Sequence, residues 1–348
     1  MPTPRFGIGE WYGRSFFELN AQDRLAFAEY RPDKNGRLKK AERSRLVALE
    51  SKLISQGNLP QRERLRLDAL RAKLTQELAT NKPCPFRSTE TDVRPCTKDG
   101  GVCSLRLYSQ TELGISAVSG ERGGIRALCP NRFHDKNEIL AWVGEVVLGT
   151  NSPLVVGEVG FLESAELLDG GEGEDVGRID MVLVDSSKPR DYPLAWAAVE
   201  IQAVYFSGKE MAGEFRAIAS DVRENGSGLI WPTENRRPDY RSSGPKRLMP
   251  QLQIKVPTLR RWGKKMAVVV DKSFFESLGQ MDEVPDLSNA DIAWFIVDFR
   301  LDLDSTRLSL VRTCTKFTTL EEAVTGLTGG TPMSQRAFED RIRGKLAA

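Results

Sequence analysis

Two acidic residues interrupt apolar, strand-like stretches of this chain, and they constrain its fold more than any other feature. Asp180 precedes Met-Val-Leu-Val, and Glu200 lies within residues 194–204, which are otherwise almost entirely apolar. A carboxylate in such a strand is unfavourable unless it is paired or binds a metal ion. Because side chains alternate along a strand, Glu200 and Gln202 share a face. Either acid alone is equally well explained by a solvated edge strand or a salt bridge, but together they favour a functional site.

The segments around these acids predict an α/β domain. A nearly continuous apolar face predicts a buried helix over residues 137–149. Helix, strands, helix and a further strand in this order are typical of a central mixed sheet flanked by helices. Strands are expected at residues 154–159, 178–184, 194–204, 266–270, 293–299 and 307–311, and further helices at 209–220, 320–327 and 332–346.

Residues 38–79 predict a helical hairpin at the N-terminal side. Leucines recur at helical spacing on both sides of the break Gly57-Asn-Leu-Pro60. Its many charged residues are typical of a solvated outer face. Contact with phosphates, or with a second copy of the chain, are the alternatives.

Residues 82–136 are rich in turn-forming residues and contain four of the five cysteines, Cys84, Cys96, Cys103 and Cys129. Such a segment has few apolar runs that could form a core without a cross-link. In a reducing cytoplasm, clustered cysteines indicate a metal site rather than disulfides. Four thiolates can hold zinc or iron in a tetrahedral site. Their spacing is not that of a zinc ribbon, so free, partly buried cysteines are the alternative.

Charge is segregated along the chain, although 50 basic and 48 acidic residues leave a net charge of only +2. Residues 236–265 contain ten basic side chains and one acid, whereas residues 157–185 contain nine acids and one base. Separate acidic and basic blocks suit metal ions and a polyanion that meet in one cleft. A solvated basic face is the alternative for any single residue. The candidate DNA-binding residues are Arg241, Lys246, Arg247, Gln251, Lys255, Arg260 and Arg261.

Asp180, followed about twenty residues later by Glu200-Ile-Gln202, resembles the PD-(D/E)xK nuclease core, with Gln202 where that motif usually has lysine. This form resembles the NotI-type restriction endonucleases. The resemblance covers residues 82–271. It also involves Cys84-Pro-Phe86, the segment from Cys96 to Ser104, Cys129-Pro-Asn-Arg-Phe133, Gly177-Arg-Ile-Asp180 and Lys246-Arg-Leu-Met-Pro-Gln251.

The resemblance implies a role for each motif. Asp180 and Glu200 would bind Mg²⁺, Gln202 would help to position the nucleophilic water or the phosphate, and an upstream glutamate would complete the site. Glu158 is our choice for that glutamate, with Glu163 and Glu166 as rivals. The four cysteines would form a structural site similar to a rubredoxin centre, which holds iron, and zinc could occupy the same ligands.

We therefore expect a helical region over residues 1–81, a Cys₄ subdomain over 82–136 and a PD-(D/E)xK nuclease domain over 137–348. The expected function is that of a type II restriction endonuclease that hydrolyses double-stranded DNA at a palindromic, GC-rich site. A two-fold site cut on both strands favours a homodimer, and a cognate DNA methyltransferase would be its functional partner. The apolar runs are too short to span a bilayer, so a cytoplasmic location is expected. A structure-specific repair nuclease and a metal-stabilised DNA-binding regulator are the alternatives.

Overall fold

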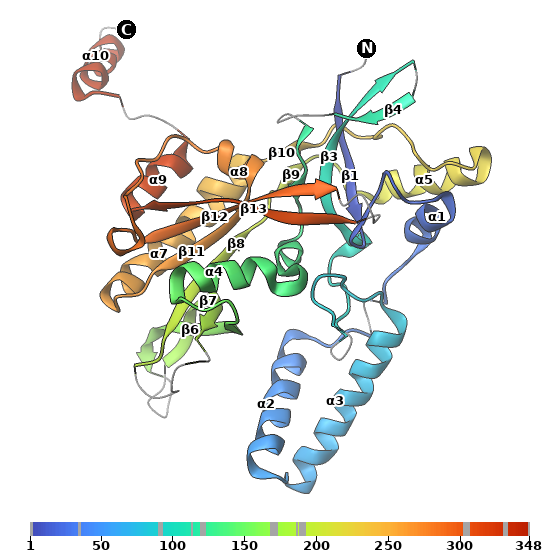
Figure 1. The fold of residues 1–348 in the computed structure, drawn as a ribbon, viewed down its shortest axis with the longest axis horizontal. Coiled ribbons are helices and arrows are strands. Elements are labelled where there is room, and N and C mark those ends of the chain that lie inside the picture. The colour runs from blue at the N-terminus through green and yellow to red at the C-terminus, as the bar shows by residue number, and fades with distance from the viewer. Residues whose placement is uncertain are drawn as a thin grey trace. The chain divides into compact units, whose positions relative to one another are not determined.

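The chain divides into two compact units in the computed structural model (Figure 1). Unit 1 comprises Met1–Lys136, Gly208–Arg237 and Arg300–Ser309, and unit 2 comprises Asn137–Ser207, Pro238–Phe299 and Leu310–Ala348. The structure describes residues 3–33, 36–89, 93–112, 114–118, 123–167, 173–185, 187, 193–301, 307–329 and 333–346.

Unit 1 is built on an antiparallel sheet with the strand order β2-β1-β3-β4, in which β5 also pairs with β3. Helices α1 (Ala21–Glu29) and α5 (Ala212–Asn225) pack on each other. Phe215 of α5 stacks on Trp11 with ring centroids 5.0 Å apart, which fixes α5 in this unit. The strands are β1 (Arg5–Trp11), β2 (Arg14–Ser15), β3 (Val102–Thr111), β4 (Gly114–Ala117) and β5 (Arg126–Ala127).

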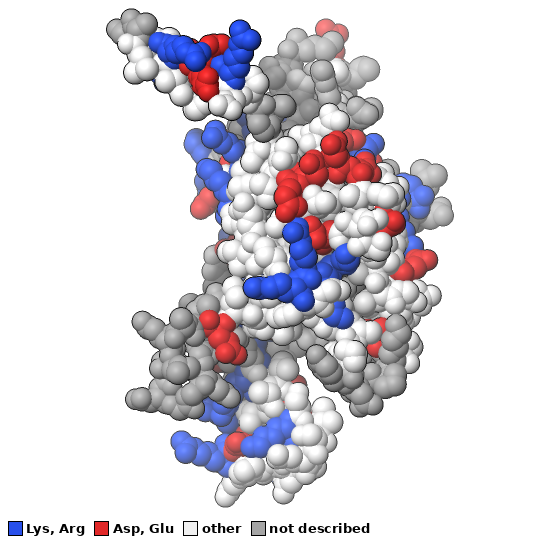
Figure 2. All heavy atoms as spheres, turned by 90° about the vertical axis from the view of Figure 1, so that its left-hand side faces the viewer, with Lys and Arg blue, Asp and Glu red and all other residues white. Residues whose placement is uncertain are grey.

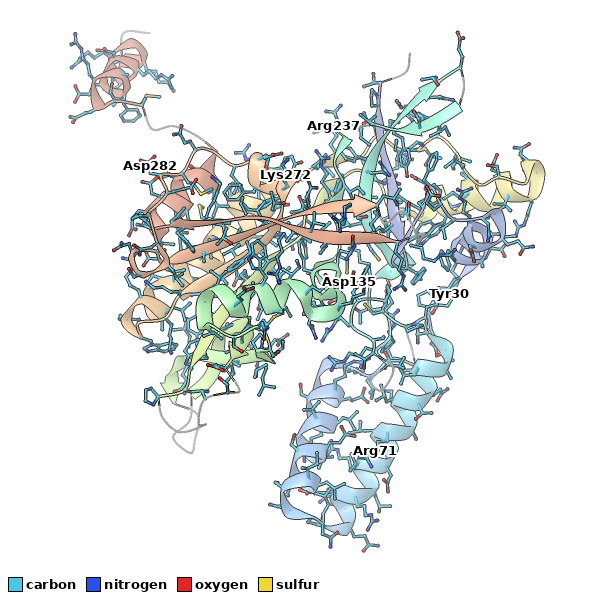
Figure 3. All side chains as sticks on the ribbon, viewed as in Figure 1. Tyr30, Arg71, Asp135, Arg237, Lys272 and Asp282 are labelled. Atoms are coloured by element: carbon cyan, nitrogen blue, oxygen red, sulfur yellow. The ribbon has the colours of Figure 1, made fainter. Side chains whose placement is uncertain are left out.

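The predicted helical hairpin is confirmed as α2 (Lys40–Gln56) and α3 (Gln61–Thr80). Leucines from both helices bury their side chains against each other, among them Leu49 and Leu67. Gly57 ends α2 in the left-handed region at φ 68°, where residues with a Cβ are disfavoured. Charged residues lie on the outer surface of the hairpin, including Arg71 (Figure 3), which pairs with Glu50. An amphipathic pattern therefore forms this hairpin without a larger core.

Unit 2 contains a six-stranded sheet with the order β13-β12-β11-β8-β7-β6. Strand β7 pairs antiparallel with both β6 and β8, whereas β8, β11 and β12 run parallel to one another, so the expected mixed sheet is confirmed. The strands are β6 (Leu154–Leu167), β7 (Gly173–Val184), β8 (Trp196–Gln202), β11 (Met266–Asp271), β12 (Ile292–Leu301) and β13 (Leu308–Thr318).

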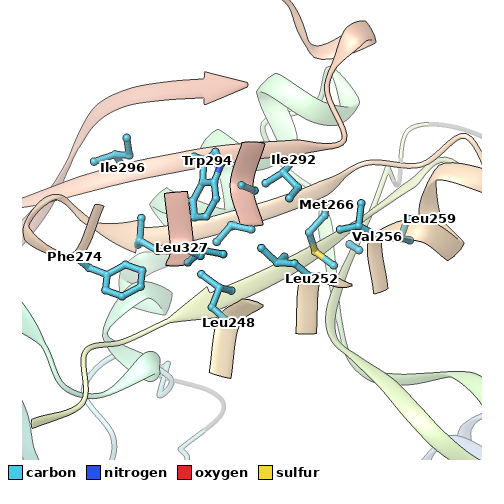
Figure 4. Packing of buried hydrophobic residues seen from close by; sticks show 14 of the residues in the cluster. Leu248, Leu252, Val256, Leu259, Met266, Phe274, Ile292, Trp294, Ile296 and Leu327 are labelled. Carbon is cyan, nitrogen blue, oxygen red and sulfur yellow. The ribbon is translucent and has the colours of Figure 1, made fainter. Parts of the chain in front are cut away.

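Helices cover both faces of this sheet. Helix α7 (Met249–Arg261) packs Leu252 and Val256 onto the face that carries Trp294 (Figure 4). Trp142 of α4 (Glu138–Leu148) meets Phe295 edge-on at 5.0 Å. Because neighbouring residues of a strand point to opposite faces, α4 and α7 lie on opposite sides of the sheet. Helix α9 (Leu320–Thr328) packs against α7.

Shorter elements complete the description. Residues 240–248 are helical: Asp239 caps α6 (Tyr240–Ser243), and a π-helical turn, η4 (Gly244–Leu248), runs on into α7. The two-residue strands β9 (Phe206–Ser207) and β10 (Arg237–Pro238) lie where the chain passes between units. Further helices among the described residues are η1 (Asp99–Gly101), η3 (Pro130–Asn137), α8 (Lys272–Glu276), η5 (Leu287–Asn289) and α10 (Gln335–Leu346). Among the described residues, none of the helices has the length and hydropathy needed to cross a membrane.

Candidate active site

Strand register brings three carboxylates into one row on the sheet of unit 2. Between β6 and β7, Gly157 pairs with Met181 and Val159 with Ile179, so Glu158 lies opposite Asp180. Between β7 and β8, Met181 pairs with Val199, and continuing this register by one residue places Asp180 opposite Glu200. Opposed residues on neighbouring strands point to the same face. Glu158, Asp180 and Glu200 therefore line up across three adjacent strands.

Lys255 joins two members of this row from α7. Its Nζ lies 2.7 Å from Glu200 Oε2 and 3.6 Å from Asp180 Oδ2. The Lys255 and Glu200 side chains are 2% and 8% exposed, whereas that of Asp180 is 59% exposed. The row thus runs from a buried ion pair at Glu200 to an open carboxylate at Asp180.

The position of Lys255 differs from our expectation of a DNA-facing residue. Its amine points into the protein because α7 presents Leu252, Val256 and Leu259 to the sheet, and Lys255 lies on that same helical face. The apolar spacing of residues 252, 256 and 259 was visible in the sequence. Reading Lys255 against that spacing, rather than as part of the basic block, would have predicted its burial.

Burial also governs the protonation of Glu200. Removal from solvent raises the pKa of Glu200 to about 7; the Lys255 ammonium opposes this shift, and the charge of Asp180 adds to it. Two neighbouring carboxylates repel each other unless a cation lies beside both. The Lys255 ammonium is such a cation, because it contacts Glu200 and Asp180.

The other predicted catalytic residues occupy distinct positions. Gln202 is buried on the same strand face as Glu200, and its Nε2 donates to the carbonyl oxygen of Ala203. Glu158 is half-exposed and pairs with Arg178 at 3.4 Å. Glu163 is paired in register with Asp175, and five residues along β6 separate it from Glu158 by roughly 16 Å. The side chain of Glu166 lies outside the described residues.

The basic candidates fall into two groups. Arg241, Lys246, Arg247 and Gln251 are exposed around η4 and the start of α7. The Arg247 guanidinium lies 3.5 Å from the centre of the Tyr205 ring and donates to its hydroxyl.

Two further candidates lie at the other end of α7. There, Arg260 pairs with Asp291 and Glu321, and Arg261 donates to Thr258. On the face shown in Figure 2, basic side chains gather beside an acidic patch rather than forming a uniformly positive surface.

The four clustered cysteines are all buried in unit 1. Cys96 interacts electrostatically with Cys84 and Cys129, and Cys103 with Cys129 and Cys96, so the thiols share one neighbourhood. Burial raises the pKa of Cys96 to about 11 and also raises the pKa values of Cys103 and Cys129, while hydrogen bonds from the backbone at Lys98, Gly13, Asn131 and Arg132 oppose these shifts. Over the described ranges, no three His, Cys, Asp or Glu side chains form a group that could hold a metal ion.

Short-range contacts and one buried ion pair hold the cysteine segment in place. The amide of Cys84 donates to the Arg94 carbonyl at 2.7 Å, and that of Cys129 to the Cys103 carbonyl at 3.1 Å. Three residues after Cys129, the fully buried Arg132 pairs with Glu10 at 3.0 Å. Arg132 also pairs with Asp135 (Figure 3). Losing one partner of such a buried pair is strongly destabilising.

Comparison with known proteins decides the family. A family model described as restriction endonuclease NotI matches residues 68–310, which include the four cysteines, the carboxylate row and Lys255. The chain belongs to the NotI restriction endonuclease family. As a member, it is a site-specific deoxyribonuclease that acts on double-stranded DNA, and restriction endonucleases typically use Mg²⁺. No curated protein matches the chain at a significant level.

The electrostatic coupling in the row predicts how stability depends on pH when no divalent cation is bound. The pKa of Glu200 rises on folding from 4.5 to about 7, so this group contributes stability below pH 4.5 that is lost as the pH rises to about 7. Asp180→Asn removes a charge that raises this pKa and should therefore make the loss smaller. Urea unfolding across this pH range, in a magnesium chelator, measures the effect. Glu145→Gln, at an exposed carboxylate on α4, is the control. Identical pH profiles for Asp180→Asn and the wild type would contradict the coupling.

Proposed function

We propose that this endonuclease hydrolyses phosphodiester bonds with Mg²⁺ held at the carboxylate row. The observation that carries the proposal is the alignment of Glu158, Asp180 and Glu200 on one sheet face. Mg²⁺ prefers oxygen ligands, and one or two carboxylates are enough when water and phosphate oxygens complete its shell. Asp180 and Glu200 fit this donor set. When bound, Mg²⁺ would supply charge for the phosphate oxygens and an activated water.

The remaining residues of the row act around these two ligands. The exposed side chain of Asp180 leaves room for a phosphate, whereas the side chain of Glu200 is held in place by Lys255 of α7. Glu158, on the outer strand, would complete the site from the open side, and Gln202 would orient the water or the phosphate. We propose that α4, β6, β7, β8, α7 and β11 form a PD-(D/E)xK core, because both acidic motifs lie on neighbouring central strands with helices on either face.

DNA contacts are proposed for Arg241, Lys246, Arg247 and Gln251, which are exposed in one continuous segment. Arginine can donate two hydrogen bonds to a guanine edge, which supports a GC-rich site, and lysine can neutralise phosphates. Arg260 ranks second, because two carboxylates, Asp291 and Glu321, already pair with it, and Arg261 lies beside it at the far end of α7. A non-cleaving DNA-binding regulator and a structure-specific nuclease are the rival functions.

Cleavage by variants of the row tests the proposal. Asp180→Asn and Glu200→Gln should cut DNA in Mg²⁺ at least about 100-fold more slowly, because losing a ligand removes charge stabilisation worth several kcal/mol. Both should keep specific binding in Ca²⁺, since base contacts come from other residues. Glu163→Gln, on β6 but away from the row, is the matched control and should cut normally. Single-turnover assays on a plasmid with one site give the rates. Normal cutting by Asp180→Asn would refute this active site, and a wild type that binds but never cuts would favour the regulator.

We further propose that Cys84, Cys96, Cys103 and Cys129 hold one iron or zinc ion that stabilises unit 1. Their shared burial and the backbone hydrogen bonds to three of the sulfurs support this, because such bonds favour thiolate ligands. Four thiolates would close the coordination shell, so the role would be structural.

Replacing any one of these cysteines with serine should lower metal content and melting temperature together, because the energy of metal binding also contributes to folding. Elemental analysis and thermal unfolding of each variant give both quantities. Cys314→Ser, at the cysteine outside the cluster, should keep the metal. Wild-type protein purified without chelators that contains neither iron nor zinc would contradict the proposal.

We also propose that the active form is a homodimer, paired in function with a methyltransferase that protects the same DNA site. Strand β6 ends the described part of the sheet, and its Leu154, Val155, Val156 and Val159 are 39–45% exposed. Exposed apolar edge strands readily pair with another chain. Antiparallel pairing of two β6 edges would be self-complementary. It would leave both carboxylate rows on the same face of one continuous sheet.

Val155→Asp should weaken this dimer several-fold, because it places like charges near each other across the two-fold axis. Sedimentation velocity over a dilution series measures the dissociation constant. Ile54→Asp, at a more exposed residue on α2, is the control and should leave association unchanged. An unchanged dimer in Val155→Asp would exclude the β6 edge.

A further inference from the structure

Gln202 leaves the strand motif of this nuclease without a cation. The side chain two residues after Glu200 is an amide, and it bonds to the neighbouring Ala203 carbonyl instead of the carboxylates. Phosphodiester hydrolysis develops negative charge on the phosphate as water attacks, and a preorganised cation beside that charge lowers the barrier. The chemistry therefore calls for an ammonium from elsewhere in the fold.

We propose that Lys255 of α7 supplies this ammonium from across the face of the sheet. The inference rests on the proposed Mg²⁺-dependent function and adds a residue to it. Lys255 Nζ lies 2.7 Å from Glu200 Oε2 and 3.6 Å from Asp180 Oδ2, so it touches both proposed ligands of the metal. A lysine two residues after Glu200 on β8 would present its amine to the same face. Lys255 reaches that place from a helix 55 residues downstream.

Stability alone gives little reason to keep the buried ion pair of Lys255 and Glu200 at this position. The neighbours of Lys255 on α7, Leu252, Val256 and Leu259, are apolar and fully buried. Replacing a buried ion pair by well-packed apolar side chains is often neutral or stabilising. The pair therefore indicates a functional requirement. The contact of the Lys255 ammonium with the open carboxylate of Asp180 places it beside the proposed position of the phosphate.

The reaction balances with Lys255 protonated throughout. The oxygen of water forms the new bond to phosphorus, the bond from phosphorus to the leaving sugar oxygen breaks, and a proton from the water passes to that oxygen through solvent. Lys255 first neutralises Glu200 and Asp180. With Mg²⁺ held by Asp180 and Glu200, the Lys255 ammonium would be free to donate to the water or to a phosphate oxygen.

A lysine swap tests the inference. Lys255→Met should cut at least about 100-fold more slowly, the loss typical of one transition-state donor. The double variant Gln202→Lys, Lys255→Met returns an ammonium to the strand and should recover at least tenfold of that loss. Lys264→Met, a half-buried lysine beyond the end of α7 that donates to the Leu194 carbonyl, is the control and should cut normally.

Two readouts separate this role from a structural one. Lys255→Met should bind cognate DNA in Ca²⁺ as the wild type does, and should bind Mn²⁺ at least as tightly, because a competing cation has been removed. Wild-type cutting by Lys255→Met, or weaker Mn²⁺ binding, would overturn the inference. If Lys255→Met does not fold, Lys255→Arg takes its place, because it keeps the buried charge. Adding Gln202→Lys to Lys255→Arg should then raise the rate of cutting. No rise in that rate would overturn the inference.

The outcome also distinguishes the inference from the proposed function beneath it. If Asp180→Asn is inactive while Lys255→Met cuts normally, the carboxylate site stands and the role of Lys255 falls. If Asp180→Asn cuts as well as the wild type, the proposed function fails, and the inference fails with it.

Discussion

The buried carboxylate of Glu200 is the constraint on which the arrangement of unit 2 depends. A charge in the middle of a mixed sheet is unfavourable unless a cation lies beside it. Glu200 is 6% exposed, and the chain meets this requirement by carrying Lys255 on the otherwise apolar face of α7. The same contact fixes the register between α7 and the sheet, because the helix must place Lys255 over β8 while Leu252 and Val256 pack on the central strands. Core packing and site geometry are therefore set by the same helix.

In unit 1, polar contacts rather than apolar packing hold the cysteine segment, since this segment has few apolar residues of its own. The segment is held at its ends by backbone hydrogen bonds of Cys84 and Cys129, and by the fully buried pair of Arg132 and Glu10. Arg132 also donates to the Leu308 carbonyl, which ties the segment to a third part of the unit. These polar links hold the backbone of the cysteine segment in place without an ion. A metal would add a closed set of bonds at the place where apolar packing is weakest.

Local patterns in the sequence predicted the elements of the fold better than their partners. Alternation predicted that Glu200 and Gln202 share a face, and helical spacing predicted α2 and α3. The row formed with Asp180 and Glu158 depends on strand register, which is set by contacts between distant segments and is not written in any one of them. Helix α5 is a second example. Its helical pattern is local, but its place in unit 1 depends on the contact of Phe215 with the distant Trp11.

Lys255 shows how one pattern can hide another. Ten basic residues in a short segment suggested a surface for DNA, and that average concealed the one lysine whose helical position is apolar. Arg260 also differs from the expected free DNA-binding arginine, because it forms ion pairs with two acids from distant segments, Asp291 and Glu321. Net charge over a window predicts a field, but the face of the helix decides where each charge points.

We propose that this fold presents its carboxylate row to double-stranded DNA at one defined sequence and cuts both strands there. The most direct test is to digest phage DNA with the purified protein in Mg²⁺ and to sequence every new end. We expect the ends to map to a single two-fold symmetric sequence, cut at equivalent positions on both strands. Ends that share no sequence, or DNA that stays intact while the protein remains bound to it, would contradict this proposal.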